Sequence, residues 1–345
     1  MPMFWMFKRF LIGWINNDCF PGVKREPSSF FKILHTFKFM KEDLQLFDYW
    51  PYDNRPKIEW PNGARIAFWV APNIEFYEID PPLNPNRKPW PRSNPHVTGY
   101  SIRDYGNRVG HMRQMKLLDK YNIRGSISLS AALCEHHPEI IEMCLERDWE
   151  FFSHGIYNTR YTYGLSEDQE REMILDAFST IEKHTGKPPS GYLAPALSHS
   201  PHTLDLFAEV GGIYTCDLFH DDQPTPVNVR DGSKFVSVPY SLEMNDTIAY
   251  VVNKIEPRYY GKIMRENFDR LYQEGAHSGT VMCIPTHNYQ ISCPHRMRAF
   301  EETLEYITGH PDVWITTGRE IAEYYIENYY DSSNADIRRK LGELL

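Results

Sequence analysis

The sequence predicts an α/β fold whose parallel strands curl into a barrel. Short apolar runs bounded by turn residues are typical of buried strands, and they alternate with longer segments that have helical apolar spacing. This alternation indicates βαβ units around a parallel sheet. Polar residues follow several of the apolar runs directly. Because strand ends in an α/β barrel open onto one rim where catalysis takes place, we expect these side chains to meet there.

The predicted strands are apolar runs of about four to nine residues, the length expected of buried strands. The first, ARIAFWVAP, ends at Pro72 and is followed by Asn73, Ile74 and Glu75. In chain order, we predict strands over residues 64–72, 124–130, 149–153, 192–195, 212–218, 234–240, 279–286 and 313–317.

Helical spacing and capping signals define the segments between the strands. Ser166 and Gln169 form a capping box, and Gly186 marks the end of the helix that follows. Pro138 suits the first turn of another helix. We predict helices over residues 107–121, 138–146, 166–186, 202–210, 257–274, 296–308 and 319–329, with loops at 50–63, 79–98 and 220–226.

Bulk properties exclude several classes of protein. A chain of 345 residues can bury one large core, and no linker interrupts residues 60–330, so we expect a single domain over residues 40–345. The net charge of −9 argues against a nucleic-acid partner. No apolar run reaches the roughly 18 residues needed to span a membrane. Six cysteines without metal-finger spacing favour reduced thiols and a cytoplasmic location.

Residues 1–39 differ in composition from the rest of the chain. They contain six basic and two acidic residues, and Met40 begins a segment that looks like a natural start. We therefore predict an N-terminal extension that is disordered or lies upstream of the native start. A membrane-surface segment and a dimer-contact arm remain alternatives.

Aromatic residues make up 14% of the chain. This content suits a site for sugars or flat heterocycles, but also an aromatic core or a subunit interface. Together with the long loop at 79–98, it leads us to expect a small-molecule substrate and a homo-oligomer.

The polar residues at the strand ends are the candidates for chemistry. Asn73 and Glu75 are two apart and share one side of a strand. His154 and Asn158 lie on one face if the chain turns helically between them. His287 follows a buried strand and is a natural proton donor to a leaving nitrogen. The alternatives are that Glu75 caps a neighbouring loop and that His287 is a rim histidine with no catalytic role.

The same residues raise the question of a metal. A catalytic zinc requires about three protein ligands and a water. Glu75 and His154 supply two, and His199, His220, Asp217 or His287 could supply the third. Arg103, at the start of a helix, could grip an anionic or ureido group, or serve a subunit contact or a structural salt bridge.

These motifs, in this order, resemble those of the polysaccharide deacetylase (NodB-homology) superfamily over residues 60–330. The GYLAPA stretch at 191–196 looks like the GYRAP-type stretch of that superfamily, and the helix at 166–186 looks like the one that follows its histidine motif. The resemblance implies a distorted (β/α) barrel. It is greatest to the branch of cofactor-independent allantoinases, cyclic imide hydrolases and intracellular peptidoglycan-deacetylase-like proteins, which the stretch at 103–106 also resembles.

The sequence departs from the deacetylase pattern at four positions. Where the superfamily has its general base, this chain has Asn73, and the arginine that tunes the base is Leu193. The second acidic position, a metal ligand, is Glu75, and the second histidine of the metal pair is Asn158. Base and arginine are missing together, as expected if a charged pair was lost as a unit.

The resemblance and the departures together predict a hydrolase of non-peptide carbon–nitrogen bonds that opens a small cyclic amide, imide or ureide. Glu75 would orient or deprotonate water, His154 would hold that water, a metal or the substrate carbonyl, and His287 would protonate the leaving nitrogen. No cofactor is required in this interpretation; Zn²⁺ or another divalent metal, if bound, would use Glu75 and His154. The expected substrate contacts are Asn73, Arg103, Tyr157, Asn158, Pro195 and His199.

Two other functions fit the same residues. A divalent-metal-dependent N-deacetylase of an amino sugar, in carbohydrate metabolism, would require a third metal ligand. A degenerate, non-catalytic binding protein would also have lost Asp at 73, His at 158 and Arg at 193, but the joint presence of Glu75, His154 and His287 argues against it.

Overall fold

The structure is a computed structural model, and it describes residues 45–82 and 95–344. The predicted extension at 1–39 and most of the predicted loop at 79–98 lie outside these residues. No helix in the described part of the chain is long and apolar enough to cross a membrane.

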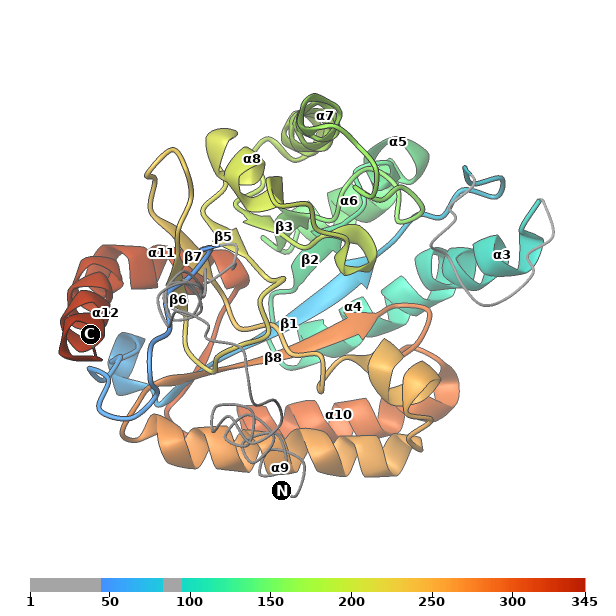
Figure 1. The fold of residues 1–345 in the computed structure, drawn as a ribbon. Coiled ribbons are helices and arrows are strands. Elements are labelled where there is room, and N and C mark those ends of the chain that lie inside the picture. The colour runs from blue at the N-terminus through green and yellow to red at the C-terminus, as the bar shows by residue number, and fades with distance from the viewer. Residues whose placement is uncertain (1–44, 83–94, 345) are drawn as a thin grey trace, which may run out of the picture. The chain divides into compact units, whose positions relative to one another are not determined.

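A curled sheet of nine strands forms the centre of the fold (Figure 1). Its order is β6-β7-β5-β4-β3-β2-β1-β8, and β9 pairs with the first residues of β1. All described pairs are parallel except β6 with β7. This confirms the predicted distorted barrel. The strands are β1 (Ile66–Ile74), β2 (Ser126–Leu129), β3 (Glu150–Ser153), β4 (Gly191–Tyr192), β5 (Tyr214–Thr215), β6 (Thr225–Val227), β7 (Phe235–Ser237), β8 (Thr280–His287) and β9 (Val313–Ile315).

Strand β1 explains why the sheet has two apolar faces. All nine of its residues are buried, and alternate side chains belong to different clusters. Ala67, Trp69 and Ala71 pack with residues of β3, β5, β7 and β8 in the inner cluster. Phe68 and Val70 pack in the larger cluster with the surrounding helices. The period of two along a strand thus separates the barrel interior from the helix layer.

Helices surround the sheet much as predicted. Ser166 and Gln169 form the capping box of α7, and Gly186 ends this helix in the left-handed conformation. Helices α9 and α10 lie side by side next to β8 (Figure 1). The helices are α3 (Val97–Tyr105), α4 (His111–Lys120), α5 (Leu133–His136), α6 (Pro138–Leu145), α7 (Glu167–Thr185), α8 (Thr203–Glu209), α9 (Pro257–Gly275), α10 (Pro294–Thr308), α11 (Gly318–Asn328) and α12 (Tyr330–Leu344).

Several elements differ from the predictions. Strand β6 falls partly in the predicted loop at 220–226, because its proline suggested a turn. It pairs antiparallel at the sheet edge, where the missing N–H of Pro226 is tolerated. Helix α3 begins at Val97, inside the last residues of the predicted loop, and α12 follows the last predicted helix.

Two π-helical turns were also not predicted: η2 (Gly106–Gly110) and η4 (Ile248–Val252). Turn η2 packs against the segment just after β8. A Cβ at Gly106 would meet the side chain of Asn288, and one at Gly110 would meet its backbone carbonyl. The contact brings Asn107 to the ends of β1 and β8, where its amide donates to the Glu75 carbonyl oxygen.

We expect Gly110→Ala to destabilise the fold by about 1–3 kcal/mol, because the added methyl group must displace the backbone at Asn288. Thermal unfolding should show a melting temperature several degrees lower. Gly342→Ala is the matched control, since this glycine is also helical and nothing lies within 4 Å of the added atom. Equal melting temperatures for the two variants would contradict the proposed close contact.

Candidate active site

The sheet order brings three predicted residues together. Strands β8, β1, β2 and β3 are consecutive neighbours, so the polar ends of β8, β1 and β3 lie within a few strand widths. The Nε2 atom of His287 lies 3.5 Å from Oε1 of Glu75, and Nε2 of His154 lies 3.6 Å from the same oxygen. The two imidazoles therefore converge on one carboxylate oxygen from opposite sides of β1, His287 from the adjacent strand β8 and His154 from β3, two strands away.

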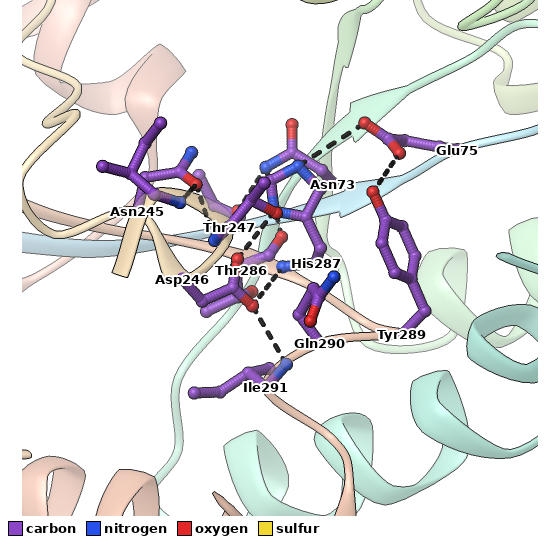
Figure 2. A network of polar contacts seen from close by, with 12 residues as sticks. Asn73, Glu75, Asn245, Asp246, Thr247, Thr286, His287, Tyr289, Gln290 and Ile291 are labelled. Carbon is purple, nitrogen blue, oxygen red and sulfur yellow. Dashed lines mark hydrogen bonds and ion pairs between the residues drawn. The ribbon is translucent and has the colours of Figure 1, made fainter. Parts of the chain in front are cut away.

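The other oxygen of this carboxylate is also held. The hydroxyl of Tyr289 donates a hydrogen bond to Glu75 Oε2 over 2.7 Å (Figure 2). Glu75 and His154 are 3% and 4% exposed, and His287 is 8% exposed. The cluster is thus almost fully desolvated, which strengthens every electrostatic interaction inside it.

Behind His287 stands a second carboxylate, that of Asp246. Nδ1 of His287 donates to Asp246 Oδ1 over 2.7 Å and lies 3.0 Å from the Thr247 hydroxyl. The other oxygen of Asp246 accepts the backbone N–H groups of His287 and Ile291 (Figure 2). Asp246 is completely buried, so it fixes the orientation of the imidazole and leaves Nε2 to face Glu75.

These contacts set the charges of the pair. Burial opposes the charged form of His287, but the carboxylates of Asp246 and Glu75 outweigh it and raise the pKa of His287 to about 10. Burial likewise opposes the charged form of Glu75, but the charge of His287 and hydrogen bonding from His154 hold the pKa of Glu75 below its usual range. At neutral pH the pair is therefore an imidazolium and a carboxylate.

His154 is held by a backbone group. Its Nδ1 lies 2.8 Å from the carbonyl oxygen of Leu193, which can only accept, so Nδ1 carries a hydrogen. The side chain of Leu193 packs into the inner apolar cluster. The position that resembles the arginine of the deacetylase pattern thus contributes a backbone acceptor and an apolar side chain.

Arg103 brings a positive charge near the strand ends that carry Glu75 and His287. Its guanidinium lies over the rings of Tyr77 and Tyr289, at 4.2 and 4.9 Å from their centroids. Asn158 donates its amide to the Tyr77 hydroxyl over 2.7 Å. Arg103 and Asn158 are therefore linked to Glu75 through two tyrosines, and sequence reasoning identified neither of these.

Asn73 lies two residues before Glu75, on the same side of β1 and deeper in the barrel. Its Nδ2 donates to the Tyr240 hydroxyl at 2.9 Å and to the Thr286 carbonyl at 3.1 Å. These bonds commit its amide hydrogens to the protein, which makes Asn73 a support of the strand ends.

The remaining predicted contacts form separate groups. His199 pairs with Asp217, Nε2 to Oδ2 at 2.9 Å, and Asp217 also accepts the backbone N–H of Ala194. Pro195 packs against Gly155, directly after His154. Tyr157 packs on Phe76 and contacts His136, which places it on the side of the helix layer.

The donor set does not fit the usual catalytic zinc. Glu75 and His154 are two ligand-type side chains, but His287 is bound to Asp246 through Nδ1, and its raised pKa keeps a proton on Nε2. His220 bonds the Thr225 hydroxyl instead. Across residues 45–82 and 95–344, no group of three or more His, Cys, Asp or Glu is arranged to hold a metal ion. Catalytic zinc sites use three protein ligands.

Sequence reasoning missed Asp246, Tyr289 and Tyr77. Tyr289 lies two residues after His287, and the same alternation that joined Asn73 to Glu75 could have identified it. Asp246 lies six residues beyond the predicted strand at 234–240, in a helical turn that leads into η4 and that the sequence pattern did not predict.

Comparisons with known proteins find similarity to deacetylases. The family described as polysaccharide deacetylase matches residues 100–214. A peptidoglycan deacetylase of Helicobacter pylori is 25% identical over 65% of this chain and 86% of its own length. A putative polysaccharide deacetylase of Schizosaccharomyces pombe is 26% identical over 79% of this chain and 93% of its own.

Solved structures are similar over most of the chain. The crystal structure of Puue allantoinase has a TM-score of 0.72 and 28% identity, covering 80% of this chain and 95% of that one. A probable polysaccharide deacetylase from Pseudomonas aeruginosa has a TM-score of 0.72 and 27% identity, covering 80% and 96%.

We expect Asp246→Asn to lower the pKa of His287 from about 10 toward the ordinary value of about 6.5, because the largest charge that favours the imidazolium is removed. A folded pKa above the unfolded one gives stability that is fully present below pH 6.5 and lost as the pH rises through 10. The variant should lose this part of the pH dependence. NMR titration of the imidazole measures the shift.

Asp217→Asn is the control for this titration. It removes the carboxylate that raises the pKa of His199, against the opposing effect of burial, and it should leave His287 unchanged. An unchanged His287 titration in Asp246→Asn would mean that Asp246 does not set the charge of this imidazole.

Proposed function

We propose that this chain, a hydrolase of carbon–nitrogen bonds similar to the polysaccharide deacetylase family, opens a small cyclic amide, imide or ureide. One observation carries the proposal. Glu75 and His287 form a buried carboxylate–imidazolium pair, backed by Asp246, in a donor set that does not supply three metal ligands. Such a pair provides a base and an acid without a metal.

In the first step, Glu75 accepts a proton from water as the water oxygen attacks the ring carbonyl carbon. The nearby imidazolium makes Glu75 a weak base while His287 is protonated. His154, with its hydrogen on Nδ1 committed to Leu193, presents Nε2 toward the same carboxylate oxygen, where it can accept a hydrogen bond from the attacking water.

In the second step, Nε2–H of His287 donates its proton to the ring nitrogen as the carbon–nitrogen bond breaks. The loss of this positive charge raises the basicity of Glu75, so the two transfers support one another. The products are a carboxylic acid and an open-chain nitrogen group. With 3.5 Å between Glu75 Oε1 and His287 Nε2, a small shift or one water returns the proton to the imidazole.

Two further features favour a small, neutral substrate. The catalytic cluster is almost fully buried, which suits a compact molecule better than a polymer chain. Asn158 and Arg103 offer an amide and a guanidinium, which match the carbonyl and N–H edges of a ring amide or ureide. The likeness to Puue allantoinase over 80% of the chain supports this choice.

The names of the sequence relatives favour a second candidate, N-deacetylation of an amino sugar. If that reaction depends on a divalent metal, it requires a ligand in addition to Glu75 and His154. Metal analysis decides between the candidates: one tightly bound metal per chain, with activity lost on chelation, would support the deacetylase.

We expect Glu75→Gln to lower kcat by about 10²–10⁴-fold, because the amide cannot accept the proton of the attacking water. Glu78→Gln is the matched control three residues away. Its carboxylate bonds Thr159 and Arg160 at the surface, and its loss should change kcat little. Circular dichroism of both variants checks folding. Full activity of Glu75→Gln would remove Glu75 from the mechanism.

We further expect ring opening to survive metal chelation. The assay is a hydrolysis screen of allantoin, hydantoin, succinimide, dihydrouracil and acetylated amino sugars before and after a chelator. Acetate release from the amino sugars without any ring opening would overturn the proposed substrate class.

The homo-oligomer, the cytoplasmic location and a role in carbohydrate metabolism stay predictions. Size-exclusion chromatography with light scattering tests the first of these directly.

A further inference from the structure

Strand β2 runs between the two strands that carry Glu75 and His154. Its ladder continues one residue past Leu129: Ser130 donates its backbone N–H to the Ile74 carbonyl, and His154 donates to the Leu129 carbonyl. Ser130 therefore occupies the end of β2 as Glu75 occupies the end of β1. The rim order is His287, Glu75, Ser130, His154.

The face of the sheet on which Ser130 lies follows from the alternation along β2. Ile127 and Leu129 belong to the outer cluster under the helices, so Ser126, Ser128 and Ser130 point to the barrel interior. The register confirms this direction, because Ser128 is the Cα partner of Asn73. Two residues further along both strands, Ser130 stands beside Glu75.

The hydroxyl of Ser130 is fully buried and has no hydrogen-bond partner in the described part of the chain. A buried hydroxyl without a partner costs free energy, and such groups call for an explanation. An oxygen atom of a bound substrate, between Glu75 and His154, would supply the missing partner.

We propose that the Ser130 hydroxyl is a further catalytic group of this site, which donates a hydrogen bond to the substrate carbonyl oxygen as negative charge develops there. This role rests on the proposed function. Glu75 carries negative charge and cannot stabilise that oxygen. Nε2–H of His287 is used to protonate the leaving ring nitrogen. The Ser130 hydroxyl, one strand away from Glu75, is a neutral donor that can stabilise the carbonyl oxygen.

The test compares Ser130→Ala with Ser128→Ala. Ser128 lies on the same strand and face, is equally buried and also lacks a partner, but it is one layer deeper beside Asn73. We expect Ser130→Ala to lower kcat about 10- to 100-fold with a smaller change in KM, since the bond strengthens in the transition state. Ser128→Ala should retain kcat, and Ser130→Thr should restore part of it.

Melting temperatures separate catalysis from folding. Both alanine variants should unfold within a few degrees of each other, because each removes one unpaired hydroxyl. Equal kcat values for Ser130→Ala and Ser128→Ala would overturn the role of Ser130.

The same series separates this inference from the proposed function. If the wild-type chain releases acetate from amino sugars and opens no ring, the proposed substrate class fails, and Ser130 is judged by the same kcat comparison on that reaction. If the wild-type chain turns over no substrate, calorimetric titration with hydantoin tests the contact: tighter binding by Ser128→Ala than by Ser130→Ala supports it, and equal or absent binding overturns it.

Discussion

The buried pair of Glu75 and His287 is the interaction on which the rest of the site depends. Two opposite charges with 3% and 8% exposure are tolerable only if they are paired and their remaining hydrogen-bonding groups are occupied. Asp246 occupies Nδ1 of the imidazole, and Tyr289 occupies the second oxygen of Glu75. Each supporting residue is needed because removal of any one leaves a desolvated charge with an unmet partner.

The fold supplies this geometry from residues that are far apart in the chain. Strands β1 and β8 are separated by some 200 residues, yet they are paired over eight positions, from Ile66 with Thr280 to Asn73 with His287. Turn η2 then locks the two strand ends, because Asn107 donates to the Glu75 carbonyl and accepts from Asn288. The glycines of η2 permit this close approach. Rigid strands, rather than the loops, thus set the separation of the Glu75 carboxylate and the His287 imidazole.

The sequence allowed prediction of the features that depend on local pattern. Period-two apolar runs and turn residues located the long strands, and the shared rim of parallel strands was enough to group Glu75, His154 and His287. Contacts made by loops could not be predicted, because nothing in the local pattern says where a loop returns. Asp246 likewise reaches His287 from an unpredicted helical turn after such a loop. Tyr157 stays a prediction as a substrate contact, and its ring packs on Phe76.

The neutral residues at positions 73 and 193 support the strand ends and carry no charge into the site. An unpaired carboxylate buried at position 73 would cost free energy, and so would an unpaired cation at position 193. Asn73 now bonds Tyr240 and the β8 backbone, and the carbonyl of Leu193 orients His154. The remaining carboxylate, Glu75, faces two imidazoles. In the proposed mechanism, this carboxylate gains basicity when His287 gives up its proton, which would couple water activation to departure of the nitrogen. This coupling suits the opening of a ring amide, where both events occur within one compact molecule.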